Sequence, residues 1–324
     1  MIYFFGINVF NLDPSKTGGQ QRYREAFECF QKEAVLISSF FELSKFAFKK
    51  NSTFVCFDER YLFLMLPLLI MKRKVFFFPR GNKLIHFSDC YSNFRLFFYR
   101  KIFSFLYSHC HQLVFQTYAQ YTEFRDMYAF KGEYSILPNH IRASWMLGLF
   151  NLDKKPFSSG QALQVGFLGG MSSRKGFKLA YEALLPLIQK NKVNFIVAGG
   201  TKDEFINFDV EALGHTDDLV RFYSRCDVII IPSKYDSFPN VFLESLASSR
   251  IPLLTLDLIT QDICGDNSRL LFKREVQSIR AIISKFIIDE SFRDELHHEC
   301  NQLKLKYDFD WCMEIRKILK VERI

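Results

Sequence analysis

Residues 235–247 read Tyr-Asp-Ser-Phe-Pro-Asn-Val-Phe-Leu-Glu-Ser-Leu-Ala, and they follow an apolar, strand-like run at 227–232. This order predicts a buried strand, a loop, and a helix that begins near Pro239. The first backbone N–H groups of a helix have no partners inside the helix, so they suit a phosphate. Asp236 lies in the loop, and Glu244 lies about one turn inside the helix. Two carboxylates that flank a helix start can hold sugar hydroxyls while the backbone holds a diphosphate, which indicates a site for an activated sugar.

The segment from Asp236 to Glu244 resembles the Glu-x7-Glu signature of the retaining, two-domain (GT-B) glycosyltransferases of family 4, the glycosyl transferases group 1. Segments at 214–227 and 251–255 agree with the same family. The resemblance is strong from about residue 165 to residue 252 and only architectural before that. In this family the first acidic residue contacts the donor hexose, and the second holds the ribose. Here the first position is Asp236 instead of the usual Glu, which makes the side chain one methylene shorter.

The resemblance also assigns the start of the predicted helix to the donor. Backbone N–H groups of Phe238, Asn240 and Val241 would face the sugar and phosphates beside Pro239, and the side chain of Val241 fits the core. His215 follows a short predicted strand, where the family has the segment beside the nucleobase. A structural surface histidine is the alternative for His215.

A second strand-to-helix turn, at 166–176, contains glycines followed by cations. Its glycine spacing is not G-x-G-x-x-G, and no acidic residue ends the next strand, which argues against a dinucleotide loop. In the family this turn supplies an Arg and a Lys that neutralise the donor pyrophosphate. Lys175 matches the Lys, whereas Phe167 replaces the usual Arg and Arg174 is the candidate substitute. For both cations the alternative is a solvated loop position.

Two glycine-containing turns in the N-terminal half are further candidates: Gly18 and Gly19 for donor binding, and Arg80 and Gly81 for the acceptor side. Gly18 and Gly19 end a polar loop, where the family's glycine loop approaches the phosphates and the acceptor, and glycine permits such an approach. Arg80 and Gly81 follow a predicted strand, where acceptor-side residues of the cleft are often found. For both pairs an ordinary turn is the alternative.

Strands alternate with helices along the chain, which predicts an α/β fold with parallel sheets. A length of 324 residues with 48% hydrophobic content suggests two domains. With the resemblance, we expect two Rossmann-like domains (GT-B) with a cleft between them. Residues 1–150 would form the N-terminal acceptor-side domain, 151–163 the linker, and 164–305 the C-terminal domain that binds the nucleotide sugar. A helix within 306–324 would return to the first domain.

Two apolar segments of the N-terminal half carry further predictions. The start of the chain predicts a first strand over 2–9, because it lacks the charged region and cleavage site of a signal peptide. The run at 61–71 predicts a buried helix and is far shorter than the roughly 20 residues that span a bilayer. Residues 92–108 predict a helix that mixes aromatic residues with cations.

The net charge of +8 is confined to the first half, since residues 1–150 carry 19 Lys and Arg against 11 Asp and Glu. The same half is rich in Phe and Tyr. Such a basic, aromatic half suits a nucleic acid or an anionic membrane surface. No nucleic-acid-binding motif is visible, so we expect a membrane surface and no nucleic acid. A merely basic protein is the alternative.

Cysteine and acidic spacings give no sign of a metal site. The eight cysteines show no CxxC pairing and lie mostly in apolar runs, which predicts reduced thiols and a cytoplasmic protein, peripheral at the inner face of the membrane. Asp308 and Asp310 form the only Asp-x-Asp and lie far in sequence from the phosphate-binding elements, so a helix cap or a surface pair is expected. We therefore expect no metal and no cofactor, with a UDP- or GDP-linked sugar as the donor substrate.

The resemblance implies transfer of a hexose from a nucleotide sugar to a saccharide or lipid-linked acceptor, with retention, in surface glycan biosynthesis. Cations and helix amides would stabilise the charge that develops on the leaving diphosphate. One alternative is a nucleotide-sugar 2-epimerase of the same fold, which would need acid/base carboxylates and histidines in the first domain; none is evident. The other is a non-catalytic nucleotide-sugar-binding homologue, suggested by Phe167 and Asp236.

Overall fold

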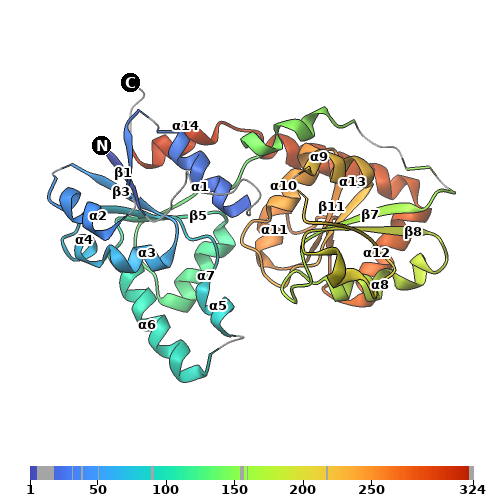
Figure 1. The fold of residues 1–324 in the computed structure, drawn as a ribbon, viewed down its shortest axis with the longest axis horizontal. Coiled ribbons are helices and arrows are strands. Elements are labelled where there is room, and N and C mark those ends of the chain that lie inside the picture. The colour runs from blue at the N-terminus through green and yellow to red at the C-terminus, as the bar shows by residue number, and fades with distance from the viewer. Residues whose placement is uncertain are drawn as a thin grey trace. The chain divides into compact units, whose positions relative to one another are not determined.

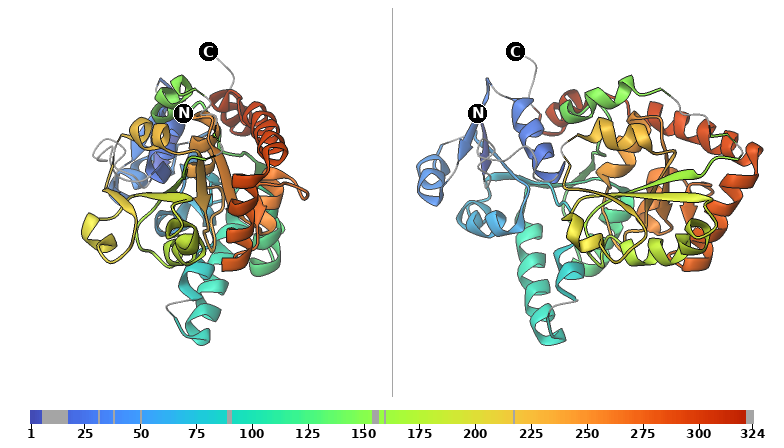
Figure 2. Two further views of the ribbon diagram at one scale, coloured as in Figure 1. Left: turned by 90° about the vertical axis from the view of Figure 1, so that its right-hand side faces the viewer. Right: turned by 45° about the vertical axis from the view of Figure 1, so that its right-hand side comes forward.

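The structure is a computed structural model of the chain. It describes residues 1–5, 18–30, 32–37, 39–49, 51–88, 91–153, 157–158, 160–216 and 218–320. The contacts divide the chain into two compact units, which Figures 1 and 2 show as ribbons: unit 1 is Met1–Pro138 with Asp310–Ile324, and unit 2 is Asn139–Phe309. This division falls before the linker expected at 151–163, because the 3-10 helix η1 (Ser144–Asn151) packs within unit 2.

Unit 1 contains a six-stranded parallel sheet in the order β2-β1-β3-β4-β5-β6. Its strands are β1 (Ile2–Phe5), β2 (Ala34–Ile37), β3 (Thr53–Cys56), β4 (Lys74–Phe77), β5 (Gln112–Phe115) and β6 (Tyr134–Ile136). The predicted strand over 2–9 is present as far as Phe5, and its remainder lies outside the described residues.

Helices cover both faces of this sheet. They are α1 (Gly18–Glu28), α2 (Phe40–Ala47), α3 (Glu59–Leu64), α4 (Leu66–Ile70), α5 (Lys83–Ser88), α6 (Asn93–His109), α7 (Tyr118–Tyr128) and α14 (Trp311–Ile318). Phe4 packs on Phe27 near the end of α1, whereas Tyr3 and Phe5 belong to a core shared with α2, α3, α4, α6 and α7. Figure 1 accordingly shows α1 and α14 on one face of the sheet and the other labelled helices of unit 1 on the opposite face.

The apolar run at 61–71 does not form the single buried helix that its composition predicts. It is split at Met65 into α3 and α4, with Pro67 in the first turn of α4. Proline has no N–H to donate to a preceding turn, so it is tolerated at the start of a helix and not inside one. Phe63 and Ile70 also face outward and are exposed, so the run is only partly buried.

The C-terminal helix α14 packs within unit 1. The indole N–H of Trp311 donates a 3.1 Å hydrogen bond to the carbonyl of Pro138. Arg316 donates to Oε1 of Glu33 at 2.9 Å, and its guanidinium lies over the ring of Phe30, 4.9 Å from the centroid. The contacts of Arg316 anchor α14 to the segment that joins α1 to β2, and the Trp311 bond anchors it to the segment after β6.

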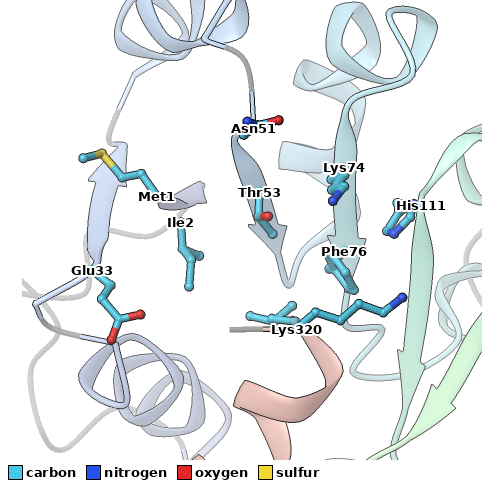
Figure 3. A pocket seen from close by; sticks show the side chains of 10 residues that line it. Met1, Ile2, Glu33, Asn51, Thr53, Lys74, Phe76, His111 and Lys320 are labelled. Atoms are coloured by element: carbon cyan, nitrogen blue, oxygen red, sulfur yellow. The ribbon is translucent and has the colours of Figure 1, made fainter. Parts of the chain in front are cut away.

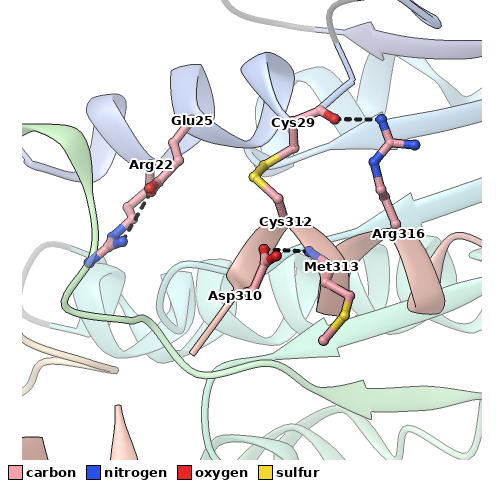
Figure 4. The surroundings of a disulfide bond; sticks show 7 residues. All are labelled: Arg22, Glu25, Cys29, Asp310, Cys312, Met313 and Arg316. Atoms are coloured by element: carbon pink, nitrogen blue, oxygen red, sulfur yellow. Dashed lines mark hydrogen bonds and ion pairs between the residues drawn. A yellow bond between two sulfur atoms is a disulfide. The ribbon is translucent and has the colours of Figure 1, made fainter. Parts of the chain in front are cut away.

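A disulfide between Cys29 and Cys312 joins the residue after α1 to α14 (Figure 4). Arg316 reinforces this connection with a 2.8 Å hydrogen bond to the carbonyl of Cys29. The prediction that all cysteines are reduced is therefore wrong for this pair. Their sequence separation of 283 explains why spacing gave no sign of the bond. The free cysteines among the described residues are Cys56, Cys110, Cys226, Cys264 and Cys300.

Unit 2 contains a second six-stranded parallel sheet, in the order β12-β11-β10-β7-β8-β9. Its strands are β7 (Leu163–Leu168), β8 (Val193–Ala198), β9 (Glu211–Gly214), β10 (Val228–Ile231), β11 (Ile251–Thr255) and β12 (Leu271–Phe272). Its further helices are α8 (Phe177–Ile188), η2 (Lys202–Phe205), α9 (Leu219–Arg225), α10 (Asn240–Ala247), α11 (Leu258–Cys264), α12 (Val276–Ile288) and α13 (Glu290–Lys306). The predicted α/β fold with two parallel sheets is confirmed.

Candidate functional site

The candidate site lies where the strand order of the second sheet reverses. The chain passes from β7 outward through β8 and β9, then returns to β10 on the other side of β7. Ligands of open α/β sheets bind outside the carboxyl ends of the strands at such a switch point. Val228 pairs with Val165 and Ile229 with Gly166, so the loops that follow β7 and β10 emerge side by side. These are the two loops that the sequence analysis singled out.

Close backbone contact holds the two loops together. The N–H of Lys234 donates a 2.7 Å hydrogen bond to the carbonyl of Arg174. Gly176 has φ +80°, and a Cβ there would lie 2.3 Å from the carbonyl oxygen of Pro232. Only glycine combines this backbone conformation with this approach. Arg274, which the sequence analysis did not single out, donates to the same carbonyl at 3.2 Å.

Three predicted residues meet across these loops. Nζ of Lys175 lies 3.1 Å from Oδ2 of Asp236, and Nη1 of Arg174 lies 3.9 Å from the same oxygen. Arg174 also donates to the carbonyl of Tyr235 at 3.2 Å. Two cations against one carboxylate leave a positive balance beside the start of α10. Positive charge at this place would favour an anionic group such as a diphosphate.

Glu244 lies inside α10 and is only 4% exposed. Its Oε2 accepts a 2.9 Å hydrogen bond from the hydroxyl of Tyr223 in α9. Burial raises the pKa of Tyr223, and the nearby charge of Glu244 raises it further, so this hydroxyl remains a donor in alkaline solution. Glu244 is therefore not a solvent-facing helix residue.

The start of α10 is shaped by its packing. Pro239 occupies the N-cap, and Asn240 is the first helical residue. The ring of Phe238 is buried and packs edge-on against Tyr307, with ring centroids 5.3 Å apart. Val241 is half-buried. The side chain of Phe238 thus belongs to the core, and its backbone is the part left for a ligand.

Near this helix start, two buried polar atoms find no partner among the described residues. Oγ of Ser233 and Oδ1 of Asn240 are buried, and neither has a hydrogen-bond partner in the described part of the chain. A buried polar atom left unpaired costs about 1–3 kcal/mol. A polar ligand would satisfy both atoms. Ser233 directly follows Pro232, and only this place after the strand could have pointed to it in the sequence.

Other predicted positions lie elsewhere. Phe167 is buried against Phe177 and Phe195, so its side chain belongs to the core. His215 is exposed and follows β9, and β8 separates that strand from β7. Of the Asp-x-Asp pair, Asp310 caps α14, as expected of a helix cap, and Asp308 pairs with Arg142.

The candidate donor-binding glycines and acceptor-side residues of the N-terminal half lie at the carboxyl edge of the first sheet. Gly18 and Gly19 are the first residues of α1, and Arg80 and Gly81 follow β4. The guanidinium of Arg80 stacks over the ring of Tyr23 in α1, 5.4 Å from its centroid. Burial lowers the pKa of Arg80. Arg80 and the two glycines therefore belong to elements that pack together.

A carboxyl that the sequence analysis missed lies at the same edge. Glu59 begins α3 just after β3 and is buried. Burial raises the pKa of Glu59 to about 7, against the opposing effect of Lys83, whose Nζ lies 3.7 Å from Oε2. The hydroxyl of Tyr107 lies 3.4 Å from Oε1. Nothing in the local sequence distinguishes this glutamate from an exposed one.

A hollow of about 650 Å³ opens at the opposite edge of the first sheet (Figure 3). Thr53 and Lys74 begin their strands there, His111 precedes β5, and Lys320 reaches in from the end of the described chain. Because this hollow faces the amino ends of the strands, it is separate from the residues described above.

Residues 162–289 match the family described as "Glycosyl transferases group 1". This segment is similar to that family. The group 1 resemblance drawn from the sequence is thereby confirmed, and the assignment to family 4 stays a prediction. The matched residues include the Lys175, Asp236 and Glu244 positions of the candidate site.

Two curated relatives share about half of this chain. The N,N'-diacetylbacillosaminyl-diphospho-undecaprenol alpha-1,3-N-acetylgalactosaminyltransferase of Campylobacter jejuni is 29% identical over 168 residues, 49% of this chain and 42% of the relative. The capsular polysaccharide biosynthesis glycosyltransferase CapM of Staphylococcus aureus is 25% identical over 149 residues, 41% of this chain and 39% of the relative. The match thus spans about two fifths of the length of these relatives.

Solved structures match nearly the whole chain. HepE of Anabaena, in complex with UDP and glucose, has a TM-score of 0.71 at 12% identity and covers 98% of this chain and 99% of its own. Sucrose-phosphate synthase of Thermosynechococcus elongatus has a TM-score of 0.75 at 11% identity, with 98% of each chain covered. At these identities the likeness shows the fold, which is GT-B.

Proposed function

We propose that this protein is a glycosyltransferase that transfers a hexose from a nucleotide sugar to a saccharide or lipid-linked acceptor. The observation that carries the proposal is the grouping of Lys175, Arg174 and Asp236 at the switch point, beside a helix that buries Glu244. Unit 2 would bind the donor. Unit 1, with Arg80 and Gly81, would face the acceptor.

Each group has a role in the proposed transfer. Glu244 would accept hydrogen bonds from the ribose, and Asp236 from the hexose. Lys175, Arg174 and the first N–H groups of α10 would bind the diphosphate and stabilise the charge that develops on it. The bond from the anomeric carbon to the diphosphate breaks while the acceptor oxygen bonds to that carbon from the same face. The acceptor proton passes to the departing diphosphate oxygen, so configuration is retained without a metal or a dedicated base.

The relatives support a finer proposal for the donor and the acceptor. HepE was solved with UDP and glucose, so a UDP-sugar is the first donor to test, with GDP-sugars second. The Campylobacter relative is named for a diphospho-undecaprenol substrate, and CapM for capsular polysaccharide biosynthesis. A lipid-linked acceptor in surface glycan biosynthesis would place this protein at the cytoplasmic face of a membrane.

The test compares Lys175→Ala and Glu244→Ala with Lys178→Ala, an exposed lysine one turn further along. Thermal-shift screening against UDP, GDP and their sugars comes first, followed by assays of transfer and donor hydrolysis. We expect loss of donor binding or turnover in the first two variants, with folding retained, and no change in the third. Unchanged kinetics in Lys175→Ala and Glu244→Ala would contradict the site.

The same assays separate the two alternatives. A 2-epimerase would convert the nucleotide sugar to its 2-epimer without releasing the free nucleotide, and the buried carboxyl of Glu59 is the acid/base candidate that such an enzyme would need in unit 1. A binding homologue would show a thermal shift with no product. Of the three possibilities, only a transferase would release UDP or GDP in a way that depends on an added acceptor.

A further inference from the structure

Helix α6 has apolar side chains on two opposite faces. One face packs into the core of unit 1 through Phe103, Leu106 and Tyr107. The other faces outward, and its side chains recur at the spacing of one helical stripe, each between 40% and 71% exposed: Phe94, Phe97, Phe98, Ile102 and Phe105. We call these five residues the α6 outer face. A helix that only covered a core would carry polar residues at these positions.

Further exposed apolar side chains lie on the helices beside α6. Helix α4 packs against α6, and Phe63 and Ile70 on the neighbouring short helices are also exposed. Figure 1 shows that the end of α6 next to α5 extends farthest from the sheet of unit 1. A groove of about 520 Å³ between α5, α6 and α7 continues the surface, with Phe97 and Arg100 on its wall. Contiguous exposed apolar surface of this kind marks a site of interaction.

The charge around this surface has one sign. Arg95 and Arg100 flank the α6 outer face. Lys101 lies between its side chains, with Nζ 5.6 Å from the ring centroid of Phe97. Helix α6 has no acidic residue, and residues 61–122 contain eight Lys and Arg but only one acidic residue, Asp89. Long cationic side chains can lay their stems on apolar surface while their charges reach a polar layer above it.

We propose that the α6 outer face docks on the surface of an anionic lipid bilayer. The aromatic side chains would enter the boundary between headgroups and acyl chains, and Arg95, Arg100 and Lys101 would contact lipid phosphates. Among the described residues, none of the helices combines the length and hydropathy that crossing a bilayer requires. The proposed contact is peripheral.

Charge argues against a second copy as the occupant. In a symmetric dimer the same patch meets itself, so the cations of one α6 would face those of the other. An anionic bilayer complements both the apolar and the cationic parts of the surface. Docking deepens the proposed function, because a lipid-linked acceptor would lie in the same bilayer. The biological reason for docking rests on the proposed function. Docking itself can be tested without that function, because vesicle binding needs neither donor nor acceptor.

The test is co-sedimentation of the full chain with vesicles of phosphatidylcholine alone or mixed with phosphatidylglycerol. The apolar variant combines Phe94→Ser, Phe98→Ser and Phe105→Ser. Its matched control is Leu258→Ser with Leu305→Ser, since both of these unit 2 residues are 76% exposed. The charge variant combines Arg95→Gln, Arg100→Gln and Lys101→Gln. Circular dichroism and nucleotide-sugar hydrolysis check that every variant is folded.

We expect the wild type and the control to bind the anionic vesicles and to bind the neutral ones weakly. The charge variant should lose on the order of 100-fold in affinity, given the contribution of each basic residue near an anionic surface. The apolar variant should lose at least about tenfold. Equal binding by the wild type and the apolar variant would overturn the proposal. So would a dimer in sedimentation velocity that the apolar variant abolishes, without vesicle binding by the wild type.

The two proposals fail separately. Nucleotide-sugar hydrolysis without vesicle binding would overturn the docking surface and leave the transferase standing. Vesicle binding lost in the α6 variants, in a protein that turns over no nucleotide sugar, would support the docking surface and count against the transferase.

Discussion

The hydroxyl of Tyr223 donates a 2.9 Å hydrogen bond to Oε2 of Glu244, and both side chains are buried. The bond connects α9 to α10 and fixes the carboxylate that we assign to the donor ribose. A buried carboxylate depends on such donors, because hydrogen bonds to charged groups contribute about 1.5–3 kcal/mol. Tyr223 is thus a positioning residue that acts through Glu244.

Replacing Tyr223 with Phe keeps the ring and removes this bond. We expect the donor KM to rise about tenfold, because roughly 1.4 kcal/mol of orientation is lost, while kcat changes less. Initial rates over a range of donor concentrations check this. The control is Tyr181→Phe, which removes a hydroxyl that accepts from the N–H of Asp209 elsewhere in unit 2. A Tyr223→Phe variant with the wild-type KM would show that Glu244 needs no such support.

Replacing Gly176 should have a steric effect at the contact between the two site loops. In Gly176→Ala the new Cβ would meet the carbonyl of Pro232 at 2.3 Å, so the loops must separate. Gly160→Ala is the matched control, since Gly160 also has positive φ, +104°, but no atom lies within 4 Å of its Cβ position. We expect Gly176→Ala to lose about 2 kcal/mol more stability than the control, together with donor binding. Similar unfolding temperatures for the two variants would argue that the loops are not in contact.

Glu59 predicts a pH dependence of stability. Its pKa is about 7 in the folded protein, raised by burial from an ordinary value of 4.5. Between these values the unfolded chain releases a proton that the folded chain retains, so stability falls as pH rises through this window. Glu59→Gln cannot ionise. Its stability relative to the wild type should therefore increase by about 2 kcal/mol from pH 5 to pH 8.

Urea unfolding in a Trp145→Phe background measures this difference, because the remaining tryptophan, Trp311, lies in unit 1. Glu133→Gln serves as the control, since Glu133 is exposed. The assignment is contradicted if the Glu59→Gln and Glu133→Gln variants respond to pH in the same way.

The disulfide predicts a redox effect on unit 1. Loss of a native cross-link usually costs about 2–4 kcal/mol. Cys29→Ser should therefore shift the Trp311 unfolding transition to lower urea, and a reductant should shift the wild type but not the variant. Cys110→Ser, which removes a free thiol of the same unit, is the control. Alkylation of the unfolded chain followed by mass spectrometry counts the thiols; two additional reactive thiols after reduction are expected.

The parts of this protein that the sequence predicts well are those that depend on neighbours along the chain. The strand, loop and helix around Asp236 follow from a short apolar run, a proline and a helical pattern, and the structure places them as β10 and α10. The contact of Lys175 with Asp236 could also be predicted, because each residue follows a strand and a parallel sheet places these two strands side by side.

The features that the sequence missed depend on residues that meet only in the folded chain. Glu59 has a raised pKa because the core buries it, and no local pattern reports burial of a helix-start glutamate. Tyr223 bonds to Glu244 across 21 residues. The exposure of the α6 outer face could not be predicted either. The sequence shows two apolar stripes on this helix, and only the structure shows which of them is covered.

The cross-link between Cys29 and Cys312 encloses every residue of unit 2 within one covalent ring. A protease that nicks a surface loop of unit 2 once would open this ring without releasing a fragment. The nicked molecule would keep its mass on a denaturing gel until a thiol is added. Integrity of this protein should therefore be judged on reduced samples.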